Sequence, residues 1–268
     1  MNFTEQSKDK KKIILITGMH RTGTSAMAGC FFNAGFNFGN INYESLVQSK
    51  KDNLKGHYEN HHFVGISNLI LKSINTNWHF ILHPKYCKEN GGEIDCKHQG
   101  TTDYPIDNFN LTYHQEFSEM VVECKKYLDS DILDNDNLVI KDPRSCIILP
   151  VYIRSMIERN DIYELYIIHM KRNDTDIGLS LNKRDGVSFD QTKIIIEKYS
   201  TLFEEYKNQI HNKLKNSIRF IDINFEDLVK NPIDSMKLIE KEFKFDILKN
   251  DTIKNKIIDF IDPDMKHF

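Results

Sequence analysis

The sequence predicts a single α/β domain in which a central parallel sheet lies between two layers of helices. Three observations support this prediction. The length of 268 residues is enough for one large domain and short for two. Helical patterns alternate along the chain with short apolar runs, an order that right-handed crossovers join into a parallel sheet. The apolar runs are typical of buried strands and lie near residues 13–17, 138–141, 165–170 and 219–223.

The composition argues against several classes of protein. Hydrophobic residues make up 40% of the chain and charged residues 28%, as in ordinary globular proteins. The net charge of -3 argues against a nucleic-acid binder held by bulk electrostatics. No apolar run approaches the roughly 18 residues of a membrane span, and residues 1–12 contain no apolar signal core. We therefore expect a cytoplasmic protein with no membrane span and no nucleic-acid partner.

The cysteines predict neither disulfides nor a metal centre. Their number, 5, is odd and they form no paired framework, so reduced thiols are expected. One loop-like region offers zinc-type ligands at His83, Cys87, Cys96 and His98. A closed zinc site usually pairs ligands about two to four residues apart, a spacing that Cys87 and Cys96 do not have. We expect no metal.

The first elements of the chain predict an anion site. Residues 1–10 lack periodicity and should be a flexible tail, with the domain covering residues 11–268. A strand at residues 13–17 then turns through residues 18–23 into a helix at 25–33. Such a turn directs backbone N–H groups and the positive end of the helix dipole at one point. Phosphate is the natural ligand.

The spacing within this turn matches a nucleotide-binding P-loop with one exception. Gly18, four residues, Gly23 and then Thr24-Ser25 follow the Walker A pattern, but Thr24 stands where that pattern has lysine. The match favours a fold like that of P-loop nucleoside triphosphate hydrolases, whereas the missing lysine disfavours an ordinary ATPase or GTPase. Arg21 supplies a bidentate cation inside the loop instead.

Residues 18–25, GMHRTGTS, resemble the phosphosulfate-binding loop of sulfotransferases that use 3'-phosphoadenosine 5'-phosphosulfate (PAPS), the bacterial-type carbohydrate sulfotransferases among them. In that family a G-x-x-R-S/T-G-T-S pattern takes the place of the Walker loop. The resemblance covers roughly residues 12–235. It implies that the donor is bound by His20, Arg21, Thr22, Gly23, Thr24 and Ser25.

Residues 55–59, KGHYE, resemble the K/R-G-aromatic-x-E segment that follows this loop in many bacterial carbohydrate sulfotransferases. Sulfuryl transfer to a hydroxyl requires removal of the acceptor proton. Glu59 is the first candidate base and His57 the second. Alternatively, Glu59 is a first-turn acid of the helix predicted at residues 60–73.

Residues 75–111 break the alternating pattern and are predicted to be a loop-rich insert. Such inserts usually lie over the carboxyl edge of the sheet, where this one can form an acceptor pocket or a lid. Trp78, Tyr86 and Tyr104 either stack on sugar rings there or pin the insert to the core. An amphipathic helix is expected at residues 112–130.

A second motif follows the strand near residues 138–141. Pro143 enforces a sharp exit, which leaves Lys141 and Asp142 at the carboxyl end of the strand, the edge where ligands bind in parallel sheets. The K-D-P sequence resembles a sulfotransferase feature in which lysine stabilises the departing phosphate oxygen, where charge grows as the sulfur–oxygen bond breaks. Arg144 assists with either substrate. The alternative is that Lys141 merely pairs with Asp142 or another surface acid.

A third motif follows the strand near residues 165–170. Arg172 lies at the strand exit, Asn173 or Asp174 caps a helix at 174–184, and Ser180 lies two turns into it. The R-x₇-S spacing resembles the family's 3'-phosphate site. Relatives often have proline at the position of Asp174, and an acid so close to a phosphate is tolerable only if its side chain caps the helix.

The rest of the chain predicts further packing elements. A long helix is expected at residues 190–216, and residues 225–232, FEDLVKNP, resemble the family's y-E-D-L…x-P segment, which starts another helix at about residue 233. A last helical pattern contains Ile253, Ile257 and Phe260.

The function predicted from these motifs is transfer of a sulfuryl group from PAPS to a hydroxyl or amine of an acceptor, a glycan in the commonest case among such relatives, without a metal. A P-loop nucleotide kinase or hydrolase is the first alternative, and Thr24 argues against it. A nucleotide-binding module without catalysis is the second. The candidate residues Glu59, Lys141, Arg172 and Ser180 are intact and argue against that reading.

Overall fold

The structure is a computed structural model that describes residues 10–39, 41, 56–73, 115–132, 135–157, 162–214 and 218–261. Several predictions lie outside the described residues: the tail apart from Lys10, the insert at 75–111 with its aromatic residues, and the zinc-type ligands His83, Cys87, Cys96 and His98. The three cysteines inside them, Cys30, Cys124 and Cys146, are buried, and none of them forms a disulfide with another described residue.

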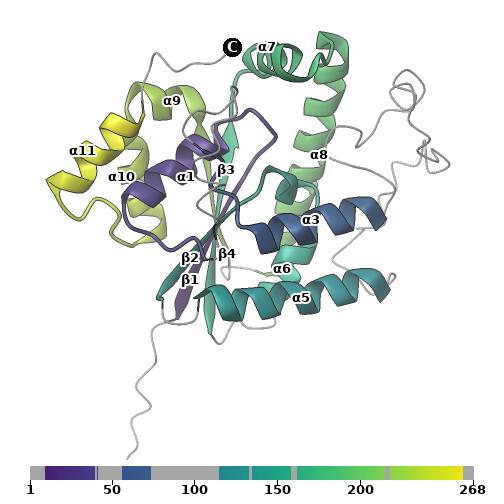
Figure 1. The fold of residues 1–268 in the computed structure, drawn as a ribbon, viewed down its shortest axis with the longest axis horizontal. Coiled ribbons are helices and arrows are strands. Elements are labelled where there is room, and N and C mark those ends of the chain that lie inside the picture. Colours follow the sequence, from purple (N-terminus) through teal and green to yellow (C-terminus); the bar gives the residue numbers. More distant parts are fainter. Residues whose placement is uncertain are drawn as a thin grey trace, which may run out of the picture.

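The core of the fold is a parallel sheet of four strands in the order β2-β1-β3-β4. Strand β1 lies in the middle, where Ile14 aligns with Val139 on one side and with Tyr166 on the other. All four predicted strands and their parallel arrangement are confirmed (Figure 1). The strands are β1 (Lys11–Thr17), β2 (Asn137–Lys141), β3 (Tyr163–Lys171) and β4 (Ile218–Asn224).

Two hydrophobic cores, one on each face of the sheet, give the fold three layers. Because successive side chains of a strand point to opposite faces, Ile13 and Leu15 belong to one core, and Ile14 and Ile16 to the other. All four are completely buried (0% exposed). This burial explains why β1 reads as a continuous apolar run.

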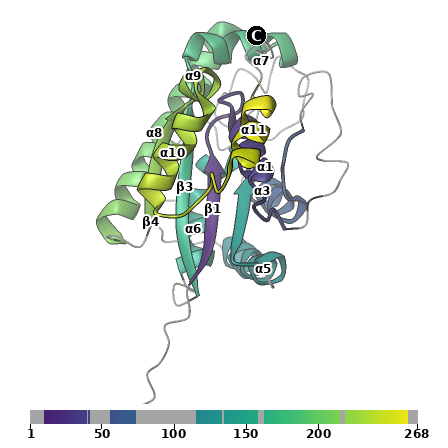
Figure 2. The same cartoon turned by 90° about the vertical axis from the view of Figure 1, so that its left-hand side faces the viewer.

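Helices cover both faces, as Figures 1 and 2 show. The first face is covered by α3 (His61–Ser73), α5 (Gln115–Ile132), α6 (Leu149–Ile157), α7 (Asp174–Asp185) and α8 (Phe189–Lys213). The second is covered by α1 (Thr24–Asn33), α9 (Phe225–Lys230), α10 (Pro232–Phe243) and α11 (Asp251–Phe260). The chain therefore has the predicted α/β/α architecture. Among the described residues, no helix combines the length and the apolar character needed to cross a bilayer.

Two helical segments after β2 were not predicted. They are the short 3-10 helix η4 (Pro143–Cys146) and α6. Pro150 is compatible with α6 because it lies at the second residue of the helix, where its missing N–H has no helical partner to lose. Almost every residue of α6 is buried, Pro150 included.

Candidate functional site

The loop between β1 and α1 is packed so closely that its glycines cannot be replaced without a rearrangement. Gly18 and Gly23 have φ angles of +141° and +90°. A Cβ atom on Gly18 would lie 2.6 Å from the carbonyl oxygen of Met170, and one on Gly23 would lie 2.2 Å from a ring carbon of Phe225. The two glycines thus let the loop fit between the ends of β3 and α9.

The start of α1 suits an anion. Its N-cap is Gly23, which offers no side chain to the first backbone N–H groups, and its first turn contains no acidic residue. Of the predicted donor-binding residues in this loop, Thr22 and Thr24 are buried, whereas His20 and Ser25 are partly exposed. The hydroxyl of Thr22 donates to the carbonyl oxygen of Met19 at 2.7 Å, so it shapes the loop.

Two arginines and a serine from distant parts of the sequence meet beside this loop. The Nε group of Arg21 donates to Oγ of Ser180 at 2.6 Å. Arg172 donates from Nη1 to the carbonyl oxygen of Arg21 at 3.1 Å, and its guanidinium lies 4.8 Å from the centre of the Phe225 ring. The residues predicted to bind the two ends of the donor therefore lie together at the carboxyl edge of the sheet.

Arg172 has donor capacity left over. Its side chain is 6% exposed, and Nε is buried with no hydrogen-bond partner among the described residues. The nearest carboxylate is Asp176, whose Oδ2 lies 3.9 Å from Nη2. Burial lowers the pKa of Arg172, although Asp176 and Glu226 act in the opposite direction. A buried guanidinium with an unused N–H group is what an incoming anion would satisfy.

The helix that carries Ser180 is capped by Asn173. Its side chain accepts hydrogen bonds from the backbone N–H groups of Thr175 and Asp176 at 2.9 and 3.4 Å. Of the two predicted caps, Asn173 is therefore the correct one. Asp174 is exposed in the first turn and does not cap the helix, so the condition set from the sequence is not met, and this acid counts against a phosphate placed close to it.

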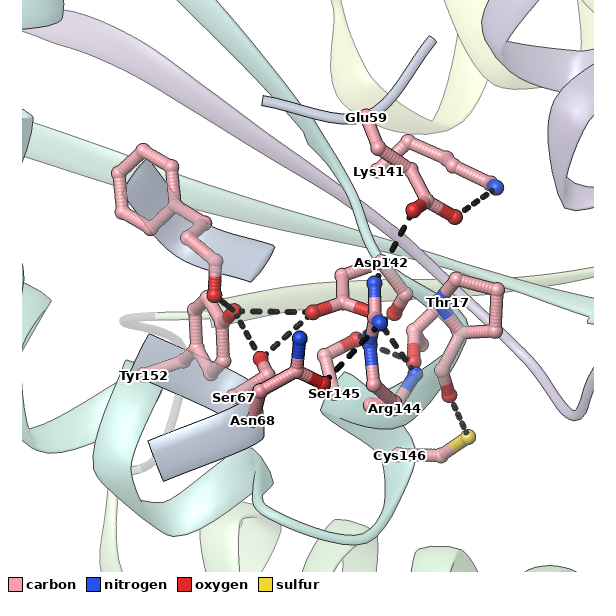
Figure 3. A network of polar contacts seen from close by, with 12 residues as sticks. Thr17, Glu59, Ser67, Asn68, Lys141, Asp142, Arg144, Ser145, Cys146 and Tyr152 are labelled. Carbon is pink, nitrogen blue, oxygen red and sulfur yellow. Dashed lines mark hydrogen bonds and ion pairs between the residues drawn. The ribbon is translucent and has the colours of Figure 1, made fainter. Parts of the chain in front are cut away.

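A second polar group lies at the end of β2 (Figure 3). Lys141 donates from Nζ to Oε1 of Glu59 at 2.8 Å, and Arg144 donates from Nη2 to Oε2 at 3.0 Å. Lys141 is only 2% exposed, whereas the Glu59 side chain is 23% exposed. The two residues predicted to be the base and the leaving-group lysine are therefore in direct contact. Lys141 therefore pairs with Glu59 and not with Asp142, which forms an ion pair with Arg144.

Glu59 lies just before α3 and does not belong to its first turn. The helix begins at His61, and the side chain of Asn60 accepts a hydrogen bond from the backbone N–H of His62 at 3.0 Å. Burial on its own raises the pKa of Glu59, but Lys141 and Arg144, with a smaller effect from His57, outweigh it and lower this pKa to about 2. Glu59 is consequently a carboxylate at neutral pH, with a cation on each oxygen.

Asp142 organises the turn after β2. Its Oδ1 accepts from the backbone N–H of Arg144 at 3.0 Å and from Nε of the same residue at 2.6 Å. Its Oδ2 accepts from the hydroxyl of Ser67 at 2.5 Å, which also contacts the Tyr152 hydroxyl at 2.8 Å. Burial by itself lowers the pKa of Arg144, but Asp142 and Glu59 raise it above its ordinary value, so this guanidinium stays charged.

Sequence reasoning missed this network in part. Asp-Pro at the end of a strand is a usable signal, because an aspartate preceding Pro at the first helical position is a common cap. No local signal indicated Ser67 or Tyr152, which reach Asp142 from α3 and α6. The hydroxyl of Ser145 donates to that of Thr17 at 2.7 Å, and this bond joins the turn to the end of β1.

Another charged cluster lies toward the β4 edge of the sheet. Asp222 contacts Nδ1 of His169 at 3.1 Å and the ammonium groups of Lys171 and Lys207 at 2.9 and 3.1 Å. Glu204 completes a set of three, with His169 and Asp222, whose ligand atoms all lie within 4.8 Å of one another. Two lysines on one carboxylate neutralise the charge that a divalent cation would need, so we interpret the cluster as an ion-pair network.

Comparison with known proteins gives similarity at the level of solved structures. No protein-family model and no curated protein sequence matches the chain. The chain is similar to a crystal structure of sulfotransferase STF1 from Mycobacterium tuberculosis H37Rv, with 11% identity over 92% of this chain and 71% of that one, at a TM-score of 0.45. It is also similar to the sulfotransferase domain from the curacin biosynthetic pathway, with 12% identity over 92% of this chain and 77% of that one, at a TM-score of 0.43. At this level neither structure indicates what this chain binds.

Proposed function

We propose that the chain is a sulfotransferase that moves a sulfuryl group from PAPS to a hydroxyl or amine of an acceptor. The observation that carries the proposal is the meeting of Arg21, Arg172 and Ser180 at the glycine loop. Sequence separations of 159 and 151 residues are bridged by hydrogen bonds there. The family resemblance of the sequence predicts each of the three residues to be a ligand of one end of this donor.

The donor would occupy two anion sites. In the proposal the loop, Arg21 and the start of α1 hold the 5'-phosphosulfate, where backbone N–H groups and the helix dipole favour negative charge. Arg172 and Ser180 hold the 3'-phosphate, and the unused Nε of Arg172 supports this assignment. Thr24 in place of the P-loop lysine argues against a kinase or hydrolase that acts on ATP.

The chemistry would take place between this loop and the end of β2. Glu59 accepts the acceptor proton, the acceptor oxygen attacks sulfur, and the bond between sulfur and the bridging phosphate oxygen breaks. Lys141 stabilises the negative charge that grows on that oxygen. Adenosine 3',5'-bisphosphate and the sulfated acceptor are the products, and the proposed mechanism requires no metal.

A nucleotide-binding module without catalysis is the second candidate. One observation favours it: Glu59 and Lys141 neutralise each other in the structure, as in an ion pair that only stabilises the fold. Binding of the bisphosphate without turnover of PAPS would support this alternative. A glycan acceptor and a cytoplasmic location remain part of our proposal and rest on the motif resemblance and on the composition.

The experiment that tests the proposal is a thermal-shift comparison of adenosine 3',5'-bisphosphate with ATP and ADP, the last two with and without Mg²⁺. A ligand that binds the folded state raises the melting temperature by mass action. We expect the bisphosphate to raise it most and Mg²⁺ to add nothing to its effect. A larger shift with Mg²⁺ and ATP would instead support a kinase or hydrolase.

A further inference from the structure

Glu59 is shared between two cations that come from the same turn. Each carboxylate oxygen has its own partner, Lys141 on Oε1 and Arg144 on Oε2, at 2.8 and 3.0 Å (Figure 3). Loss of one partner therefore leaves the other in place. The mechanism proposed above needs the ammonium of Lys141 at the bridging oxygen of the donor, whereas in this structure it is hydrogen-bonded to Glu59, the proposed base.

The two cations differ in how firmly they are held. Two hydrogen bonds fix Arg144: its Nε donates to Oδ1 of Asp142 at 2.6 Å, and its Nη1 donates to Oδ1 of Asn68 at 3.3 Å. Asp142 is itself completely buried (0% exposed) and bonded to Ser67. Within the described part of the chain, the ammonium of Lys141 makes one hydrogen bond, to Glu59. To reach a new anion the buried Lys141 has to give up one hydrogen bond, whereas Arg144 would also have to break its contacts with Asp142 and Asn68.

We infer that Arg144 is the positioning residue that holds Glu59 at the acceptor oxygen while Lys141 leaves it for the donor. This inference rests on the proposed function. The charged groups that face Glu59 are Lys141, Arg144 and His57, and Asp142 lies behind Arg144. When the phosphosulfate draws Lys141 away, Glu59 keeps its place through Arg144 and loses one of its two neighbouring cations.

Loss of that cation makes Glu59 a better base. With both cations present its pKa is about 2, which gives a carboxylate little affinity for the acceptor proton. An opposite charge within hydrogen-bond distance lowers the pKa of a carboxylate by roughly one to three units, so the departure of Lys141 restores proton affinity. The donor thereby activates the base. The acceptor proton goes to Oε1 of Glu59, which Lys141 has left. The acceptor oxygen bonds to sulfur as the bond between sulfur and the bridging phosphate oxygen breaks, and the ammonium of Lys141 stabilises the negative charge on that oxygen.

The test uses the full chain with Arg144→Lys and Arg144→Met. From this position lysine keeps the charge but cannot span Asp142 and Glu59 as the guanidinium does. We expect turnover at saturating PAPS to fall about tenfold or more in Arg144→Lys, because a misplaced base costs up to roughly 10²-fold. The KM for PAPS and the calorimetric Kd for the bisphosphate should stay within about twofold, since Arg144 does not contact the nucleotide in this scheme.

The pH profile separates positioning from stability. Turnover at saturating substrates reports the base in the enzyme–substrate complex. At low pH turnover falls as the base is protonated, and this part of the profile is its acid limb. In Arg144→Met the acid limb should move to higher pH by about one unit, because loss of its remaining cation raises the pKa of Glu59. A residue that only stabilises the fold would change the melting temperature and leave the acid limb in place. Arg219→Met, which removes a guanidinium bonded to the carbonyl oxygen of Phe243 at 3.0 Å, is the matched control and should leave the limb unchanged.

If neither Arg144 variant folds, Asn68→Ala is the substitute. Asn68 is an exposed residue of α3, and its replacement removes one hydrogen bond that holds Arg144. This variant should lower turnover severalfold at constant KM for PAPS. An unmoved acid limb in Arg144→Met, or unchanged turnover in Arg144→Lys or in Asn68→Ala, would overturn the role of Arg144 and leave the proposed function standing. Absence of both PAPS turnover and bisphosphate binding in the wild-type protein would overturn the two together.

Discussion

Replacement of Lys141 separates catalysis from folding most clearly. Lys141→Met shortens a buried, 2% exposed side chain by one heavy atom and removes its charge, which leaves no large cavity. In the proposed mechanism the ammonium acts on the oxygen on which charge grows during transfer, so its loss should raise the barrier more than it weakens ground-state binding. We expect turnover of PAPS to fall about 10²-fold or more, while the Kd for adenosine 3',5'-bisphosphate changes only a few-fold.

The structure also limits the effect of this replacement on stability. The lost charge-assisted hydrogen bond to Glu59, 2.8 Å long, is worth about 1.5–3 kcal/mol, and the saved desolvation of the ammonium offsets part of it. Glu59 keeps Arg144 as a partner at 3.0 Å, so no buried charge is stranded. The free energy of unfolding, measured by denaturant titration, should therefore fall by less than about 3 kcal/mol.

Lys171→Met is the matched control. Lys171 ends strand β3, which β1 separates from β2, and it is 43% exposed and pairs with Asp222 at 2.9 Å. An exposed ion pair contributes up to about 1 kcal/mol, and this one lies outside the proposed site, so turnover should not change. Lys141→Arg should rescue poorly, since a planar fork does not reproduce a point charge at one oxygen. Wild-type turnover in Lys141→Met, or an equal loss of turnover and bisphosphate affinity, would refute the leaving-group role.

Three further predictions concern the base and the loop. Glu59→Gln should lower turnover roughly 10²–10⁴-fold at nearly constant nucleotide affinity, and undiminished turnover would move the role of base to His57 or to no residue. Because folding lowers the pKa of Glu59 from 4.5 to about 2, Glu59 stabilises the fold above pH 4.5 and loses this contribution as the pH falls toward 2. Denaturant titrations between these pH values should thus show a smaller acid-induced loss of stability in Glu59→Gln than in the wild type, and identical losses would contradict this account. Gly23→Ala should destabilise the fold and abolish bisphosphate binding, because a Cβ there would lie 2.2 Å from a ring carbon at the start of α9. Gly35→Ala, at a similar φ of +82° with nothing within 4 Å, is the control and should cost only about 1–2 kcal/mol.

The parts of the fold that could be predicted from the sequence are those with a local cause. The apolar runs of β1 and β3 predict buried parallel strands because both faces of the sheet are covered, and Gly18 and Gly23 predict the loop because only glycine fits their φ angles and packing. The order of the motifs along the chain placed Arg172 and Ser180 near the loop, because carboxyl ends of parallel strands share one edge.

The parts that could not be predicted depend on contacts between distant residues. Glu59 and Lys141 are 82 residues apart in the sequence, and nothing in the residues around either one indicates that the two side chains form an ion pair. The same holds for Arg144. Its three side-chain partners are Asn68 in α3, Glu59 just before α3, and Asp142 in the turn that contains Arg144 itself. Helix α6 gives little local signal, because it is only 9 residues long and has Pro150 at its second position.

Calorimetry with adenosine 3',5'-bisphosphate and AMP tests the central claim most directly, since the two ligands differ by the 3'-phosphate alone. The account predicts that the wild-type protein binds the bisphosphate at least about tenfold more tightly, the smallest advantage expected from a charge-assisted hydrogen bond of about 1.5–3 kcal/mol. It also predicts that Arg172→Ala erases most of this difference, because Arg172 holds the 3'-phosphate in the proposed site. Equal affinities of the wild-type protein for the two ligands would contradict the assignment of PAPS as the donor.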